Sequence, residues 1–284
     1  MLDQTFQDIK IIISDDGSTD NSPKIIKTYC EKYPDKICCI EGSATGSAKQ
    51  NFARLLEHCD DDYIMFCDQD DVWLPNKVEH TLGLMKQVEN QNALIPVLVH
   101  TDLKVVSSDL NVISNSFFDF QKLGSDLTLP QLLVQNNVTG CTVMINRALK
   151  EKCGVIPSEC IMHDWWLGLV ATLFGKVAFL SEPTILYRQH SGNQVGAKAA
   201  YGFGFIKRKL LTLDKVRSDY NATYTQAEIL LEQYSECLNE GQRSTLQKYC
   251  EIPKMCKLKR IRTIEKYGFK KCTLLRVLGQ YFLM

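Results

Sequence analysis

The sequence predicts an α/β fold in which a mostly parallel sheet is flanked by helices. Short apolar runs alternate with helix-length segments along the first 200 residues, which is the order of a sheet built from strand-helix units. The 284-residue chain is 45% hydrophobic, enough for a sizeable core. No apolar run approaches the roughly 20 residues that a membrane-spanning helix needs.

The first predicted strand, Lys10 to Ser14, is a continuous apolar run, which is typical of a strand buried on both faces. Ser22 and Pro23 then favour a helix start, because Ser caps helices and Pro suits their first position. Residues 1–8 are interpreted as the end of a helix and a loop. The other predicted strands are 37–40, 63–66, 97–106, 141–145 and 176–180. The predicted helices are 22–33, 48–58, 75–89, 129–135 and 163–174.

The charges divide the chain into two regions. Formal net charge is zero, which argues against a general nucleic-acid binder, yet residues 205–284 carry 16 Lys and Arg against 8 Asp and Glu. We therefore expect a first domain over residues 1–200 and a helical, basic C-terminal extension over residues 201–284. In FGFIKRKLLTL and KKCTLLRVLGQYFLM, basic side chains stand beside apolar ones. Such helices lie on an anionic membrane, or pack on the first domain with a solvated basic face.

The twelve cysteines are scattered, without a C-x-x-C pair or a signal peptide. This usage favours reduced thiols in a cytoplasmic protein. Cys250 and Cys256 lack the usual spacing of zinc ligands.

Two acidic turns follow predicted strands, where open α/β sheets bind their ligands. Asp15 and Asp16 follow the first strand, and a structural turn explains them as well as a binding site does. Asp68, Asp70 and Asp71 follow the third strand. Only one of these three carboxylates can cap the next helix, so the other two repel unless a cation joins them. Asp68 and Asp70 suit Mg²⁺, which takes one or two protein carboxylates together with substrate phosphates.

Four strings extend this interpretation: IIISDDGSTDNS, KQNFARLLEHCDDDYIMFCDQDDVW, HDWW and YRQHSGN, in order from residue 11 to residue 193. Together they resemble the family 2 inverting glycosyltransferases of the GT-A fold, and specifically their bacterial rhamnosyltransferase-like branch. That family normally begins with a further strand, central in the sheet, and a helix. The resemblance therefore implies a GT-A domain without its first strand-helix unit, which would leave neighbouring strands unpaired.

The resemblance implies a donor site. Asp16, with Asp15 beside it, would contact the base and ribose of a nucleoside-diphosphate sugar. Asp71 and Trp73 would shape the pocket for the donor sugar. Lys49 would lie near the diphosphate, although a solvated helix lysine explains it equally well.

It also implies a metal ion and a general base. Asp68 and Asp70 form a D-x-D motif for Mg²⁺ or Mn²⁺, and His190 would be a third ligand or a diphosphate contact. Asp164 matches the base that takes the proton of the acceptor hydroxyl. Without the resemblance, Asp164 would be interpreted as a helix cap. His163 either orients Asp164 or only packs.

The implied function is transfer of a sugar to a cell-surface polysaccharide or a lipid-linked acceptor, at the inner face of the plasma membrane. The branch implies dTDP-linked L-rhamnose, and UDP-linked hexoses stay open. Two alternatives are a sugar nucleotidyltransferase, whose Gly-rich basic N-terminal loop is absent here, and an inactive remnant that binds sugar nucleotides weakly.

Overall fold

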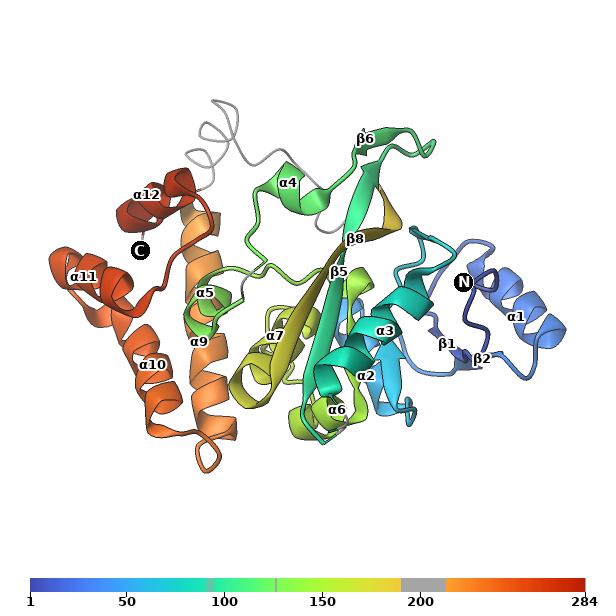
Figure 1. The fold of residues 1–284 in the computed structure, drawn as a ribbon, viewed down its shortest axis with the longest axis horizontal. Helices are drawn as coiled ribbons and strands as arrows, with labels where there is room; N and C mark the ends of the chain where they lie inside the picture. The colour runs from blue at the N-terminus through green and yellow to red at the C-terminus, as the bar shows by residue number, and fades with distance from the viewer. Residues whose placement is uncertain (91, 93, 126, 190–212, 284) are drawn as a thin grey trace.

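The computed structural model describes the chain except for residues 91, 93, 126, 190–212 and 284. Three parts follow one another across the molecule: a small unit of β1, β2 and α1, a central sheet with its helices, and the helices α9 to α12 (Figure 1). The strands are β1 (Ile11–Ser14), β2 (Ile37–Ile40), β3 (Tyr63–Met65), β4 (Val72–Trp73), β5 (Val97–Val106), β6 (Val112–Ser114), β7 (Met144–Asn146) and β8 (Lys176–Arg188). The helices before residue 190 are α1 (Ser22–Lys32), α2 (Ala48–Glu57), α3 (Lys77–Glu89), α4 (Phe117–Gln121), α5 (Leu129–Val134), α6 (Arg147–Cys153) and α7 (His163–Phe174).

The central sheet has the strand order β3-β7-β5-β8-β4, with β6 paired to β5. β5 and β8 run parallel, whereas β3–β7, β7–β5, β8–β4 and β5–β6 are antiparallel pairs. The predicted α/β class is confirmed, but the sheet is mixed rather than mostly parallel. The sequence could not show this, because the strand-helix alternation lapses over residues 107–143 and β7 enters from the short 3₁₀ turn Gly140–Thr142.

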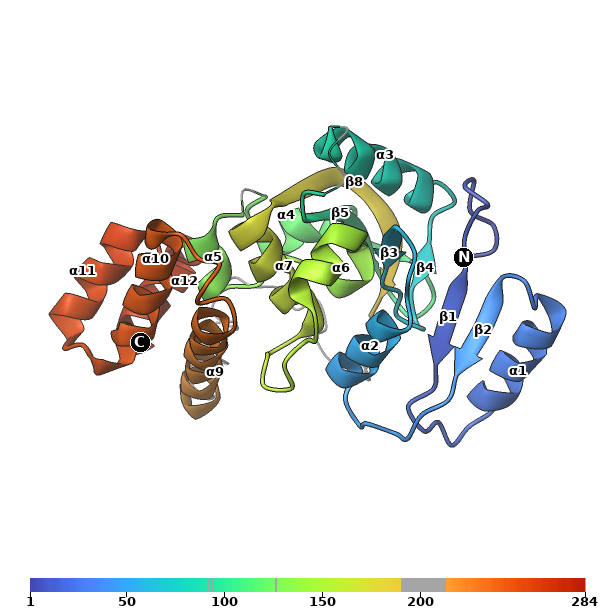
Figure 2. The ribbon, with the colours of Figure 1, turned by 90° about the horizontal axis from the view of Figure 1, so that it is seen from below.

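β1 and β2 form a separate, parallel two-stranded sheet. Figure 2 shows this unit set apart from β3 and β4. It is fastened to α2 by polar side chains: Ser14 Oγ donates to Asn51 Oδ1 at 2.7 Å, and Arg54 donates to Ser14 Oγ at 2.6 Å. Within the described residues no strand joins β1 to β3.

β5 organises the core through the two-residue period of a strand. Val97 and Val99 pack with Leu82 and Met85 of α3 on one face. Leu98 points to the other face and belongs to a cluster with Trp166 of α7. Burial on both faces explains why this strand is a continuous apolar run in the sequence.

The described C-terminal residues, 213–283, are helical and contain no strand, which confirms the predicted helical region. Tyr220, Leu230 and Tyr249 join the apolar cluster of Trp166 and Leu132, so the helices share a core with the sheet layer. The predicted boundary at residues 200 and 201 lies outside the described residues. None of the described helices combines the length and apolarity needed to cross a membrane. The helices are α9 (Leu213–Gln233), α10 (Glu240–Glu251), α11 (Lys257–Tyr267) and α12 (Leu274–Leu283).

The first ten residues contain no helix, so the prediction of a helix end there was wrong. Side-chain and backbone bonds to the start of α3 hold this segment in place as a turn and an irregular stretch instead. Gln4 Nε2 donates to the carbonyl of Leu74 at 2.8 Å, and Gln4 Oε1 accepts the N–H of Val78 at 3.0 Å. Gln4 thereby satisfies one of the free N–H groups at the start of a helix.

Gly175 lies where α7 ends and β8 begins, and the close backbone there predicts a large stability effect. A Cβ on this residue would stand 1.8 Å from the carbonyl oxygen of Pro96, so backbone must move. We expect Gly175→Ala to lower the free energy of unfolding by about 2–4 kcal/mol.

Gly83→Ala, in the middle of α3, is the matched control. A Cβ there meets nothing within 4 Å, and alanine is the better helix former by about 1 kcal/mol. Urea unfolding of the two variants should therefore show opposite signs. An unchanged Gly175→Ala midpoint would contradict the close approach of Pro96.

Candidate active site

The acidic turn follows β3 at the carboxyl end of that strand and leads into β4. Burial, together with the neighbouring carboxylates of Asp71, Asp70 and Asp164, raises the pKa of Asp68 to about 7. Asp164, far along the chain, is thus close enough to act on the turn electrostatically. The predicted metal site and the predicted base are therefore within electrostatic reach of one another in the folded chain.

Asp68, Asp71 and Cys141 converge most closely: one ligand atom from each lies within 4.8 Å of the others. Asp70 is not part of this cluster, and its predicted metal role stays a prediction. Asp71 Oδ2 is buried, and Oδ1 accepts the N–H of Arg188 at 3.2 Å. Burial raises the pKa of Asp71 to about 6, against hydrogen bonds from the Cys141 thiol and the Arg188 N–H that lower it. A buried carboxylate whose other donor is only a weak thiol fits a cation site.

Cys141 supplies a thiol but is a weak candidate ligand. Burial raises the pKa of this thiol well above its ordinary value, and the carboxylates of Asp71 and Asp68 raise it further. Metals bind the thiolate, and Mg²⁺ and Mn²⁺ prefer oxygen. Sequence reasoning missed this residue, because a lone cysteine between glycine and threonine carries no ligand spacing.

Lys77 is a second residue that the sequence did not single out. Its side chain is fully buried, with Nζ 4.8 Å from the centre of the Trp73 ring and 3.4 Å from Thr184 Oγ1. Burial lowers its pKa to about 8, and the nearby acidic groups Cys141, Cys67 and Asp71 oppose that shift. This ammonium therefore offsets part of the negative charge of the acidic turn. Trp73, predicted to shape the sugar pocket, is itself buried, and its ring packs against the Lys77 ammonium.

Asp164 lies in the first turn of α7 and is 7% exposed. Its Oδ1 accepts the N–H of Trp165 at 2.7 Å, so part of its role is that of a helix cap. Burial raises the pKa of Asp164 to about 6, against hydrogen bonds from Trp165, Asn136 and Gly140 that lower it. A Cβ on Gly140 would stand 3.4 Å from Asp164 Oδ2, so that glycine permits a close approach.

His163 packs and does not orient Asp164. Its ring lies 4.5 Å from that of Phe52 and 5.1 Å from that of Phe66, measured between centroids. Both ring nitrogens are buried without a hydrogen-bond partner among the described residues. Burial lowers the pKa of His163 to about 4, so the ring is neutral at pH 7.

Asp15 and Asp16 lie at the carboxyl end of β1. Asp15 contacts its own turn, and Asp16 contacts the loop before α2. Asp15 accepts the N–H of Ser18 at 3.0 Å. Asp16 Oδ1 accepts the N–H of Thr45 at 2.5 Å and its hydroxyl at 2.9 Å. The N–H of Thr45 lowers the pKa of Asp16. Asp16 therefore ties the loop before α2 to the turn after β1.

Lys49 and His190 are the two remaining residues predicted to bind the donor or the metal ion. Lys49 Nζ donates to the carbonyls of Ser158 and Cys160 at 2.5 and 2.6 Å. Its ammonium thus fastens α2 to the loop before α7, and its predicted diphosphate contact stays a prediction. His190 lies outside the described residues.

Comparison with known proteins shows the family of this chain. A family model described as glycosyl transferase family 2 matches residues 1–150, which include the acidic turn. The chain belongs to glycosyl transferase family 2. It is therefore a transferase enzyme, and its acidic turn lies within the part that defines the family. Asp164 lies beyond the matched residues.

Two bacterial proteins are similar to this family 2 chain over most of its length. The dTDP-rhamnosyl transferase RfbG of Shigella flexneri is 28% identical over 240 residues, 78% of this chain and 74% of its own. An uncharacterized protein of Mycobacterium tuberculosis is 28% identical over 188 residues, and the match covers 64% of this chain and 51% of its own. Among solved structures, S. aureus TarS has a TM-score of 0.54 at 15% identity, covering 93% of this chain and 44% of TarS. That likeness confirms the predicted GT-A fold.

Proposed function

We propose that the protein transfers a sugar from a nucleoside diphosphate to a saccharide or lipid-linked acceptor, with inversion and with a divalent metal ion. One observation carries the proposal: buried Asp164 acts electrostatically on the carboxylate turn that follows β3. An inverting transfer needs these two parts together. A base must accept the proton of the acceptor hydroxyl while a cation offsets charge on the departing diphosphate.

Asp68, with Asp70 and Asp71, would hold the Mg²⁺ or Mn²⁺ ion, and His190 would add a ligand. The repulsion among these carboxylates and the burial of Asp71 support this assignment. When bound, the ion would offset the negative charge of the diphosphate. Asp15 and Asp16 would contact the base and ribose, and Lys49 the diphosphate.

Asp164 would take the proton from the attacking hydroxyl onto its carboxylate. A pKa of about 6 suits this task, because the group is ionised at neutral pH yet is a stronger base than an ordinary aspartate. Asp164 is 7% exposed, so an acceptor hydroxyl could reach only a small part of this residue.

The pKa of Asp164 leads to a pH prediction. Its raised value means that protonation removes the base below pH about 6 rather than below about 4. At saturating Mn²⁺, which keeps Asp68 and Asp71 ionised, we expect kcat/KM to fall about tenfold per pH unit below pH about 6 and to level off above it. A stopped or discontinuous assay across pH 4.5–8 would measure this limb. An acid limb centred near 4 would contradict the assignment of the base.

The donor would be dTDP-linked L-rhamnose, since the Shigella relative carries that name, and UDP-linked hexoses are the other candidates. All twelve cysteines are free thiols, which supports a place in the reducing cytoplasm. Contact with the inner face of the plasma membrane belongs to the same proposal, because a lipid-linked acceptor would be reached there.

Release of nucleoside diphosphate from dTDP-rhamnose and UDP-glucose, in Mn²⁺ and in EDTA, tests the proposal. We expect release that depends on Mn²⁺ and prefers one donor. Formation of pyrophosphate would mark a nucleotidyltransferase, and no release from any donor would mark an inactive remnant. Either result would overturn the proposal.

A further inference from the structure

Helix α12 presents an apolar stripe to solvent. Leu274, Leu278 and Phe282 recur every four residues, and their exposed fractions are 75%, 53% and 68%. Leu275, beside them on the helix surface, is 39% exposed. Helices of globular proteins normally turn such a stripe toward the core, so this one is available to a partner.

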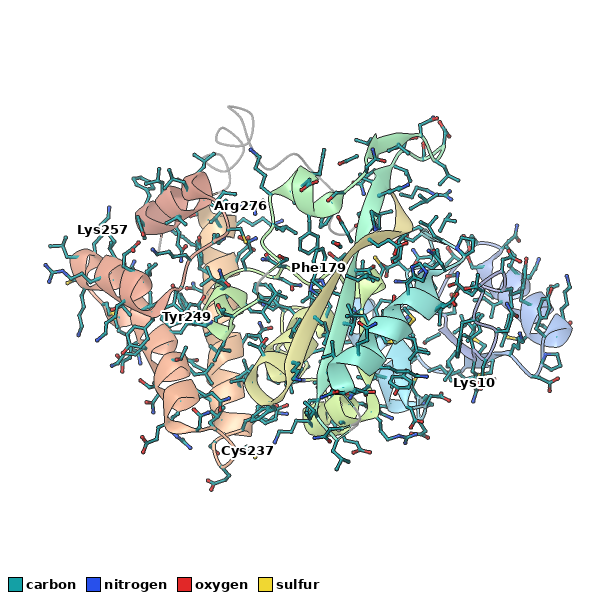
Figure 3. The ribbon with its side chains drawn as sticks, in the orientation of Figure 1. Lys10, Phe179, Cys237, Tyr249, Lys257 and Arg276 are labelled. Carbon is teal, nitrogen blue, oxygen red and sulfur yellow. The ribbon has the colours of Figure 1, made fainter. Side chains whose placement is uncertain are left out.

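The orientation of α12 is fixed by its opposite side. Val277 is buried, and Gln280 Nε2 donates to the carbonyl of Phe269 at 2.6 Å. Arg276 donates to the carbonyl of Gln121 at 3.0 Å, and Figure 3 shows Arg276 on the side of α12 nearer the middle of the molecule. The apolar stripe is thus held outward by contacts on the other side of the helix.

Basic residues are frequent in the segment that carries this stripe. Residues 257–283 contain eight Lys and Arg and one acidic residue, Glu265. Lys257 Nζ lies 5.5 Å from the centre of the Phe282 ring, and Figure 3 shows Lys257 at the outer end of α11. Next to it, Leu258 is 72% exposed. Apolar and basic side chains therefore meet at the same edge of the molecule.

We infer that α11 and α12 form a docking face for an anionic phospholipid bilayer. The bilayer matches both features, since its acyl layer accepts a shallow apolar stripe and its acidic headgroups attract the surrounding cations. A second copy of this chain would match the apolar stripe but would place like charges against one another. The inference rests on the membrane contact in the proposed function, but vesicle binding needs neither donor nor metal, so its failure is distinguishable from a failure of catalysis.

Co-sedimentation of the full chain with vesicles tests it, using phosphatidylcholine alone and phosphatidylcholine with phosphatidylglycerol. We expect binding to the anionic vesicles, weakened by salt. The double variant Leu278→Asp with Phe282→Asp should bind them at least about tenfold more weakly, because two inserted side chains are lost. Val155→Asp is the matched control, since Val155 is 72% exposed on the sheet domain and should leave binding unchanged.

Lys257→Glu tests the electrostatic part and should also weaken binding to anionic vesicles. Circular dichroism melting of each variant confirms that the fold is intact. Three results would overturn the inference: no binding of the wild type, equal binding by the stripe variant, or equal binding by wild type to neutral vesicles. Dimerisation without lipid that the stripe variant abolishes would also overturn it, and would identify this face as an interface between copies.

Discussion

Asp164→Asn is expected to lower kcat about 10²- to 10⁴-fold, the contribution typical of general base catalysis. Asparagine keeps the shape and can still cap α7, but it cannot accept the proton of the acceptor hydroxyl. Donor affinity should change less than about threefold, because a base acts on the acceptor rather than on the nucleotide. Initial rates and calorimetric titration of the nucleoside diphosphate would measure the two quantities.

Asp109→Asn is the matched control, because Asp109 is an exposed aspartate in the turn between β5 and β6. It should leave kcat and melting temperature unchanged. If Asp164→Asn instead melts earlier and loses nucleotide affinity in step with activity, Asp164 is a structural cap. Turnover near that of the wild type would mean that another residue is the base.

Asp68→Ala is expected to abolish binding of a nucleoside diphosphate that depends on Mn²⁺. Asp68 belongs both to the D-x-D pair and to the cluster with Asp71 and Cys141, so either ligand set loses a carboxylate. Asp70→Ala should have a similar effect, because Asp70 would also hold the ion. Calorimetry in Mn²⁺ and in EDTA would separate metal-dependent from metal-independent affinity.

Cys141→Ser distinguishes the two ligand sets. We expect it to keep Mn²⁺-dependent affinity within about threefold, because a buried thiol with a raised pKa stays protonated and is a poor ligand. A loss as large as that of Asp68→Ala would show that Cys141 binds the ion. Unchanged affinity in Asp68→Ala would remove the metal assignment altogether.

The sequence predicted the strands and helices whose patterns are local. The apolar run of β5 and the start of α1 near Pro23 are decided by neighbouring residues, and both elements were predicted close to their observed bounds. The predicted Ser22 cap was wrong, because Asn21 is the N-cap and α1 has no side-chain cap bond. Short elements were missed: β4 has two residues and β6 three, and long-range pairing rather than local preference forms them. The antiparallel insertion of β7 between β3 and β5 likewise has no local signal.

The candidate site divides in the same way. The acidic turn was visible because three carboxylates crowd into four positions. Its approach to Asp164 followed from the family resemblance rather than from spacing. Lys77 and Cys141 were missed because their importance comes from burial beside the acidic turn, and burial of a lysine has no sequence pattern. Lys49 contacts loop carbonyls that lie more than a hundred residues away, a contact that is equally invisible in the sequence.

The anomeric configuration of the product tests whether Asp164 is the base of an inverting transfer. One displacement by a hydroxyl that Asp164 deprotonates must invert the sugar carbon relative to the donor. NMR of the product formed from the preferred donor, read from the one-bond carbon-hydrogen coupling at that carbon, reports the configuration. We expect the product to be inverted relative to the donor. Retention would require a second displacement, and it would contradict the role given to Asp164.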